Sequence, residues 1–156
     1  MIGWAAAAFA LAVVVAGCGG SYTKRDFAAR ANAICASTVR ATRSVAAPNF
    51  TGNGSHRLPA TAAYLNKVLP LVQSEARKIR RLPVPSESAA QRVKLHKYLN
   101  ALTRAVSEYR AMALAASHRA TSDFASAETA LGANPVTALA TSYGLKSCGA
   151  PGATVR

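Results

Sequence analysis

Apolar residues recur every three or four positions along most of the chain after residue 23, and this period predicts amphipathic α-helices. The first stretch begins at about residue 24, where Thr23 and Asp26 have the spacing of a capping box. Its inward side is expected to consist of Phe27, Ala31, Ile34, Cys35, Thr38, Thr42 and Val45. Cys35 is therefore predicted to point into a core.

Two longer stretches follow a loop at 47–58 that is rich in turn residues. In the second stretch, Pro59 suits the first helical turn, and Pro70 is expected to kink the helix. Ser86 is predicted to cap the third stretch. The inward positions of the two are Ala62, Leu65, Val68, Leu69, Val72, Ala76 and Ile79, and then Leu95, Leu99, Leu102, Val106, Tyr109, Ala113 and Ala116.

A fourth stretch is expected to start at Ser122 or Asp123 and to break at 132–135, where Asn134 can cap and Pro135 can open a new turn. Gly144 then suits a left-handed helix stop. Stretches of this length joined by short connections predict an all-α fold, an antiparallel helical bundle of about four helices.

The composition agrees with this fold class. Of 156 residues, 51% are hydrophobic, but only 6% are aromatic and 36 are alanine, the residue that most favours a helix. A β-sandwich or barrel is therefore disfavoured. The length allows one ordinary domain and argues against a two-domain enzyme.

The N-terminal residues follow a different pattern. Residues 2–16 carry no charge and contain an apolar run of the length of a signal-peptide core, shorter than the roughly 20 residues of a permanent membrane span. The run ends in Val15-Ala16-Gly17-Cys18, which resembles the lipobox of bacterial lipoproteins. This resemblance implies cleavage before Cys18, lipidation of its thiol, and anchoring of an exported protein to the outer face of the cytoplasmic membrane. The run lacks the basic residues that usually precede it, and an ordinary secretory signal or a buried helix is the alternative.

The remaining cysteines form one possible pair. If Cys18 is lipidated, Cys35 and Cys148 are left in a compartment where disulfides persist. A bridge that closes a loop of roughly 100 residues contributes at most about 4.7 kcal/mol in the chain-entropy model. Two buried free thiols, or a reactive thiol or metal site, are the alternatives.

Two short motifs carry a second resemblance. They are Asp26-Phe27 with Ala31-Asn32-Ala33-Ile34-Cys35, and Tyr143-Gly144-Leu145-Lys146-Ser147-Cys148-Gly149. The chain thereby resembles a group of small exported helical lipoproteins of high-GC bacteria. The resemblance implies a helical fold and an envelope address, pairs the two cysteines, and supplies no activity. We expect a signal peptide at 1–17, a lipidated tether at 18–22, a bundle domain at 23–149 and a flexible tail at 150–156.

Basic residues dominate the charge, with 19 Lys and Arg against 6 Asp and Glu, a net charge of +13. A hairpin between the second and third helices would gather seven of these cations at one end, namely Arg77, Lys78, Arg80, Arg81, Arg92, Lys94 and Lys97. This anionic-partner patch fits anionic lipid or a phosphate-bearing cell-wall polymer, while nucleic acid is not expected at this address. The alternative is compositional, because high-GC coding enriches arginine and helix C-termini favour cations.

No residue set forms a catalytic or metal-binding motif. His56, His96 and His118 stand apart, and Glu75 and Glu108 are expected to form weak surface pairs with basic neighbours. We therefore expect a non-enzymatic binding or scaffold module with no catalytic residues, metal or cofactor and no identified protein partner. The alternative is a small apolar ligand carrier, with a pocket opened between helices by Pro70 and the break at 132–135.

Overall fold

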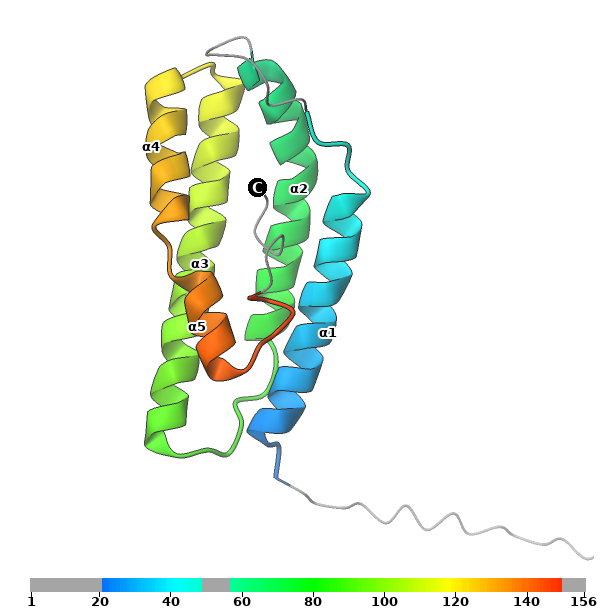
Figure 1. Cartoon of the computed structure of the whole chain (residues 1–156), viewed down its shortest axis with the longest axis vertical. Helices are drawn as coiled ribbons and strands as arrows, with labels where there is room; N and C mark the ends of the chain where they lie inside the picture. The colour runs from blue at the N-terminus through cyan, green and yellow to red at the C-terminus, as the bar shows by residue number, and fades with distance from the viewer. Residues whose placement is uncertain (1–20, 49–56, 150–156) are drawn as a thin grey trace, which may run out of the picture.

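The computed structural model describes residues 21–48 and 57–149, and this part of the chain contains five α-helices. They are α1 (Lys24–Arg43), α2 (Leu58–Arg80), α3 (Ala89–Ser117), α4 (Thr121–Gly132) and α5 (Val136–Tyr143). The first three run antiparallel in turn, and α4 and α5 return one after the other along α3 (Figure 1). The predicted all-α bundle is confirmed, with two short helices in the fourth position.

Local sequence explains where the first helix begins and where the last helix ends. The Thr23 hydroxyl accepts a hydrogen bond from the Asp26 N–H at 3.3 Å, and the Thr23 N–H donates to the Asp26 carboxylate at 2.9 Å, which completes the predicted capping box. At the other end, Gly144 has a φ of 98° and stops α5. Glycine adopts this left-handed conformation at little cost, so that the Leu145 N–H can donate to the Ala140 carbonyl at 2.9 Å.

Two predicted helix starts are corrected. Ser88, not Ser86, caps α3, and its hydroxyl accepts from the Gln91 N–H at 3.4 Å. The Ser86 N–H donates instead to the carbonyl of Tyr22 at 2.9 Å, so this residue ties the α2–α3 loop to the start of α1. The fourth helix begins at Thr121, slightly earlier than predicted and without a side-chain cap.

The two long helices differ in how much of their surface is covered. α2 continues to Arg80 across Pro70, which lies on its exposed side. α3 packs against α2, α4 and α5 and is the centre of the bundle. Its buried surface is therefore wider than the single predicted stripe and also includes Tyr98, Ala101, Ala105, Met112 and Ala115.

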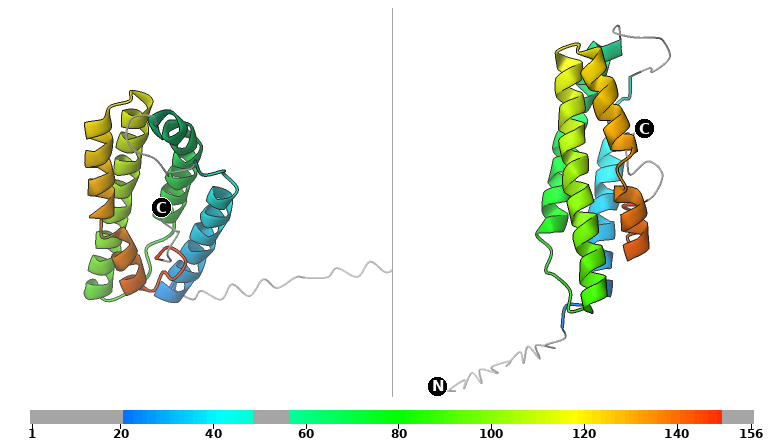
Figure 2. Two further views of the ribbon diagram at one scale, coloured as in Figure 1. Left: turned by 45° about the horizontal axis from the view of Figure 1, so that its top comes forward. Right: turned by 90° about the vertical axis from the view of Figure 1, so that its left-hand side faces the viewer.

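Buried apolar side chains form two clusters, one in each half of the molecule. The ribbon shows these halves: α4 runs along one half of α3, and α5 runs along the other (Figure 2). We call the half with the start of α1 proximal and the half with α4 distal. The proximal core contains Phe27, Ala31, Cys35, Ile79, Leu95, Tyr98, Tyr143 and Leu145. The distal core contains Leu58, Ala62, Leu65, Val68, Tyr109, Met112 and Ala116.

A disulfide holds the proximal half together. Cys35 on α1 and Cys148, which follows α5, are joined across 113 positions with their Cα atoms 5.2 Å apart. Beside the bridge, the Ser147 N–H donates to Asn32 Oδ1 at 2.8 Å. A Cβ at Gly149 would clash with Thr141 Oγ1 and lie 3.1 Å from the Thr137 carbonyl oxygen, so glycine suits this close approach to α5. The predicted Cys35–Cys148 bridge is confirmed.

Candidate functional site

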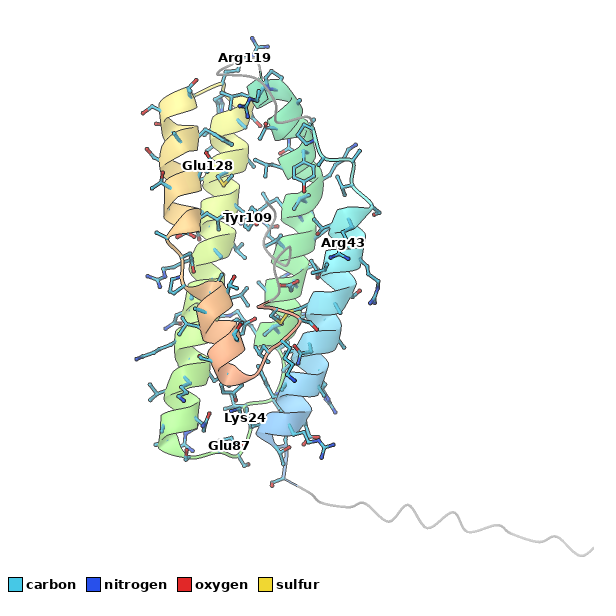
Figure 3. All side chains as sticks on the ribbon, viewed as in Figure 1. Lys24, Arg43, Glu87, Tyr109, Arg119 and Glu128 are labelled. Atoms are coloured by element: carbon cyan, nitrogen blue, oxygen red, sulfur yellow. A yellow bond between two sulfur atoms is a disulfide. The ribbon has the colours of Figure 1, made fainter. Side chains whose placement is uncertain are left out.

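The chain enters the bundle at its proximal end and is tied there to the α2–α3 loop. The Lys24 N–H donates to Glu87 Oε1 at 3.0 Å, and the Lys24 ammonium donates to Gln91 Oε1 at 3.1 Å. Figure 3 shows Lys24 and Glu87 side by side at this end, with Arg119 at the opposite end. Together with the Tyr22–Ser86 bond, these contacts fix the point from which residues before 21 leave the domain.

Aromatic rings close the proximal core next to this point. Phe27 and Tyr143 meet edge to face with their ring centroids 5.8 Å apart, and the Lys24 ammonium lies 4.9 Å from the centroid of Tyr143. The Arg30 guanidinium lies 5.3 Å from the ring of Tyr22. Burial raises the pKa of both tyrosines, so both rings carry neutral hydroxyls at physiological pH.

All seven residues of the anionic-partner patch are exposed. Arg77, Lys78 and Arg80 occupy the last turn of α2, Arg81 caps it, and Arg92, Lys94 and Lys97 lie in the first turns of α3. Because α2 ends and α3 begins at the proximal end, the seven cations belong to the same end as the chain entry (Figure 1). The hairpin that the sequence predicted therefore exists.

Within this surface the structure brings only some of the cations together. Arg77 and Arg80 line a groove of about 280 Å³ between α2 and α3 with Arg110, and Arg80 donates to Thr103 Oγ1 at 2.6 Å. A shallower hollow gathers Arg80, Lys97 and Arg104. Arg104 and Arg110 were not part of the predicted patch because they lie far from the hairpin in sequence, although the groove follows both helices.

The acidic residues also occupy other places than expected. Glu75 is half buried, not paired at the surface, and burial raises the pKa of its carboxyl to about 7 although a hydrogen bond from Thr38 partly offsets this shift. Burial and the nearby Glu75 also raise the pKa of Tyr98, whose buried hydroxyl has no hydrogen-bond partner among the described residues. Glu108 accepts a hydrogen bond from Asn134 Nδ2 at 2.8 Å. This bond fixes the break between α4 and α5 against α3.

The distal half contains a pocket of about 580 Å³. α2, α3 and α4 supply most of its wall, and the break before α5 and the first turn of α5 supply the rest. The sequence predicted a pocket at the break at 132–135 and at Pro70, but Pro70 is not among the lining residues. The apolar side chains include Tyr64, Leu65, Met112, Phe124, Leu131 and Val136. A pocket of this size and character is typical of small-molecule sites.

A second hollow of about 230 Å³ adjoins this pocket. The two share Thr61, Phe124 and Glu128, and the second adds Arg57 and the first residues of α2 and α4. The Arg57 Nε atom is buried and has no hydrogen-bond partner within the described ranges. Arg57 thus lines one end of this hollow, while its Nε atom is covered by neighbouring protein atoms.

Several predicted features lie outside the described residues, namely the signal peptide, Cys18, the tether up to residue 20, His56 and the tail. His96 and His118 are both exposed on or at the end of α3. In residues 21–48 and 57–149, no group of three or more metal-ligating side chains comes together.

No family model matches the chain, and no curated protein or solved structure matches it either. Among the described helices, none is both long enough and apolar enough to cross a membrane. The disulfide indicates an extracytoplasmic location, because such bonds persist in oxidising compartments. The fold and the bridge together define a helical bundle of an extracytoplasmic protein.

Proposed function

We propose that this protein is a lipid-anchored, non-enzymatic binding module whose proximal end docks on the anionic surface of the membrane that holds its anchor. The observation that carries the proposal is the shared position of the chain entry and the seven patch cations at that end. The bundle would then stand on the membrane with its distal half outward.

The length of the tether supports a membrane surface over a distant wall polymer. Only two residues separate Cys18 from Ser21, where the described chain begins, and three residues extend to about 10 Å at most. A lipidated Cys18 would therefore keep the patch within reach of lipid headgroups. Lys24 and Arg25, in the first turn of α1, add two cations beside the tether.

The electrostatic contribution is large enough to matter. Each Lys or Arg held near an anionic bilayer contributes about 1 kcal/mol, and acyl anchors are strengthened by a second signal such as a polybasic patch. The acidic groups at this end are already engaged, since Glu87 accepts from Lys24 and Asp26 from Thr23. Among the patch cations, Arg80 donates to Thr103 and Arg92 donates to the Glu87 carbonyl, but both acceptors are uncharged and leave the positive charges unneutralised.

The anchor is tested by labelling the producing bacterium with radioactive palmitate. The parent protein should take up the label and should accumulate as a precursor when globomycin blocks lipoprotein processing. A Cys18→Ser variant should take up none. Equal labelling of the parent and the variant would show that the anchor is absent.

The docking surface is tested separately with residues 19–156 exported behind a cleavable secretory signal, a protein that has neither the apolar run nor acyl chains to hold it to a bilayer. It should bind vesicles containing phosphatidylglycerol in low salt, bind them less in high salt, and ignore neutral phosphatidylcholine vesicles. Changing Arg77, Lys78, Arg80 and Arg81 to Gln should abolish most of this binding.

A matched control removes the same charge from exposed positions on other parts of the bundle, by changing Arg40, Arg43, Lys67 and Arg119 to Gln. The control should keep most of the vesicle binding. Equal losses in the two variants would reduce the effect to net charge and contradict a docking surface. Stronger retention on polyglycerol phosphate than on vesicles would assign the patch to a wall polymer instead.

A further inference from the structure

We propose that the distal half contains a binding site for a single-chain amphiphile with an anionic head, such as a long-chain fatty acid. The chain would occupy the pocket of about 580 Å³, and the head would occupy the adjoining hollow of about 230 Å³. This function is additional to membrane docking and uses the opposite half of the molecule.

The main pocket offers an apolar environment of a suitable size. Leu65 and Met112 are buried at its wall, and Phe124 and Leu131 are half buried from α4. Small-molecule pockets typically enclose about 300–1,000 Å³, which includes the present volume. An aliphatic chain placed there leaves water, and each buried methylene contributes to affinity.

The pocket follows from how the helices pack. α2 and α4 both pack on α3, but α1 packs on α2 and is joined to the chain after α5, far from the start of α4. The distal parts of α2 and α4 are therefore separated by a space that α1 does not fill. The break at residues 133–135 bounds this space on the side of the proximal half.

The adjoining hollow has the chemistry of an anion site. α2 and α4 both begin there, and neither start has a side-chain cap. Free N–H groups at a helix start attract negative charge. The first turn of α4 contains Asp123, whereas the first turn of α2 contains no acidic residue, although Pro59 supplies no N–H there. The start of α2 is therefore the more positive of the two.

Arg57 gives the second, independent indication of an anion. Its buried Nε is a donor without an acceptor among the described residues, and it lies at the start of α2. A buried donor is costly to leave unpaired, and a turn of the Arg57 side chain toward the hollow would let a carboxylate head accept a charge-assisted hydrogen bond from it. Glu128 is exposed on the shared wall, where its charge opposes an anion but is screened by water.

The experiment measures displacement of anilinonaphthalene sulfonate from the same exported protein of residues 19–156, which carries neither an acyl chain nor the apolar run. Palmitate should displace the probe more strongly than hexadecanol, which has the same chain and an uncharged head. Arg57→Gln should weaken the binding of palmitate by about tenfold or more and leave the binding of hexadecanol nearly unchanged. Glu128→Gln should strengthen the binding of palmitate slightly.

A blocking variant tests whether the chain lies in the pocket. Gly132 lines the pocket, and a Cβ built there meets no atom within 4 Å, so Gly132→Phe can fill space without moving the wall. It should abolish the binding of both ligands, whereas Gly132→Ala should keep it. Any of three results would overturn the proposal. They are the absence of binding by the parent, unaltered palmitate binding by Gly132→Phe, and equal effects of Arg57→Gln on the binding of palmitate and hexadecanol.

Discussion

The two halves of the bundle differ in how they are closed. In the proximal half, α1, the end of α2, the start of α3 and α5 surround a core in which Phe27, Tyr98 and Tyr143 are almost fully buried, and the disulfide lies beside them. In the distal half, Tyr64 and Tyr109 are also buried, but no disulfide is present among the described residues and a pocket remains between α2 and α4. One chain can thus close one half of a helical bundle around a covalent bridge and leave a cavity in the other half.

One of the two largest expected effects comes from removing the bridge. A protein with both Cys35→Ala and Cys148→Ala should lose about 2–5 kcal/mol of unfolding free energy, because the unfolded chain gains the freedom that the bridge denies it. Urea unfolding followed by circular dichroism measures the loss. The parent protein in strong reductant should match the variant, and a variant as stable as the oxidised parent would remove the contrast between the halves.

A pair of equal truncations sharpens the contrast in packing. Leu95→Ala in the proximal core should cost about 3–5 kcal/mol, because a new cavity opens among tightly packed side chains. Leu65→Ala should cost less, about 2–3 kcal/mol, since Leu65 already borders the pocket and loses fewer contacts. Both residues are buried to a similar degree, with 1% and 3% of their surface exposed, so burial alone predicts equal losses. Equal losses measured by urea unfolding would contradict the difference in packing.

A smaller effect should appear in the pH dependence of stability. Burial raises the pKa of Glu75 from its ordinary 4.5 to about 7. Between these values the unfolded chain ionises Glu75 while the folded chain keeps it protonated, so stability should fall as the pH rises from 4.5 to 7. The total fall is at most about 3 kcal/mol and is complete above pH 7.

Urea unfolding at several pH values measures this fall. Glu75→Gln, which stays neutral, should lack the part of the fall in stability between pH 4.5 and 7 that ionisation of Glu75 causes. Glu128→Gln, at an exposed carboxyl, is the matched control and should retain the parent's slope. A parent protein whose slope is the same as that of Glu75→Gln would show that Glu75 is not buried in the folded protein.

Much of the fold could be predicted from single-helix patterns. The capping box at Thr23, the left-handed stop at Gly144 and the inward position of Cys35 depend on local sequence, and the structure confirms all three. The cap of α3 could not be predicted in this way. Ser86 and Ser88 are equally good caps locally, and the bond from Ser86 to Tyr22, a long-range contact, decides between them.

Features that depend on two or three helices were harder to predict. Glu75 lies beside the apolar stripe of α2. Its burial depends on neighbours from other helices, among them Thr38 on α1 and Tyr98 on α3. The pocket was anticipated at the break of the fourth helix, but not its extension to Arg57. That extension exists because α2 and α4 begin at the same end, which is a property of the topology.

The position of the disulfide divides the chain topologically. Residues 35–148 form a closed covalent ring, and of the described bundle only the segment from 21 to 34 and Gly149 lie outside it. A pull exerted through the N-terminus therefore loads this short segment first, through the Tyr22–Ser86 and Lys24–Glu87 contacts. The segment can peel from the bundle one turn at a time, but the peeling stops at Cys35. The disulfide then transmits the load to Cys148, which is near the C-terminal end of the domain in sequence but lies beside Cys35 in space. The helices between the two cysteines are thereby protected from being unravelled one after another.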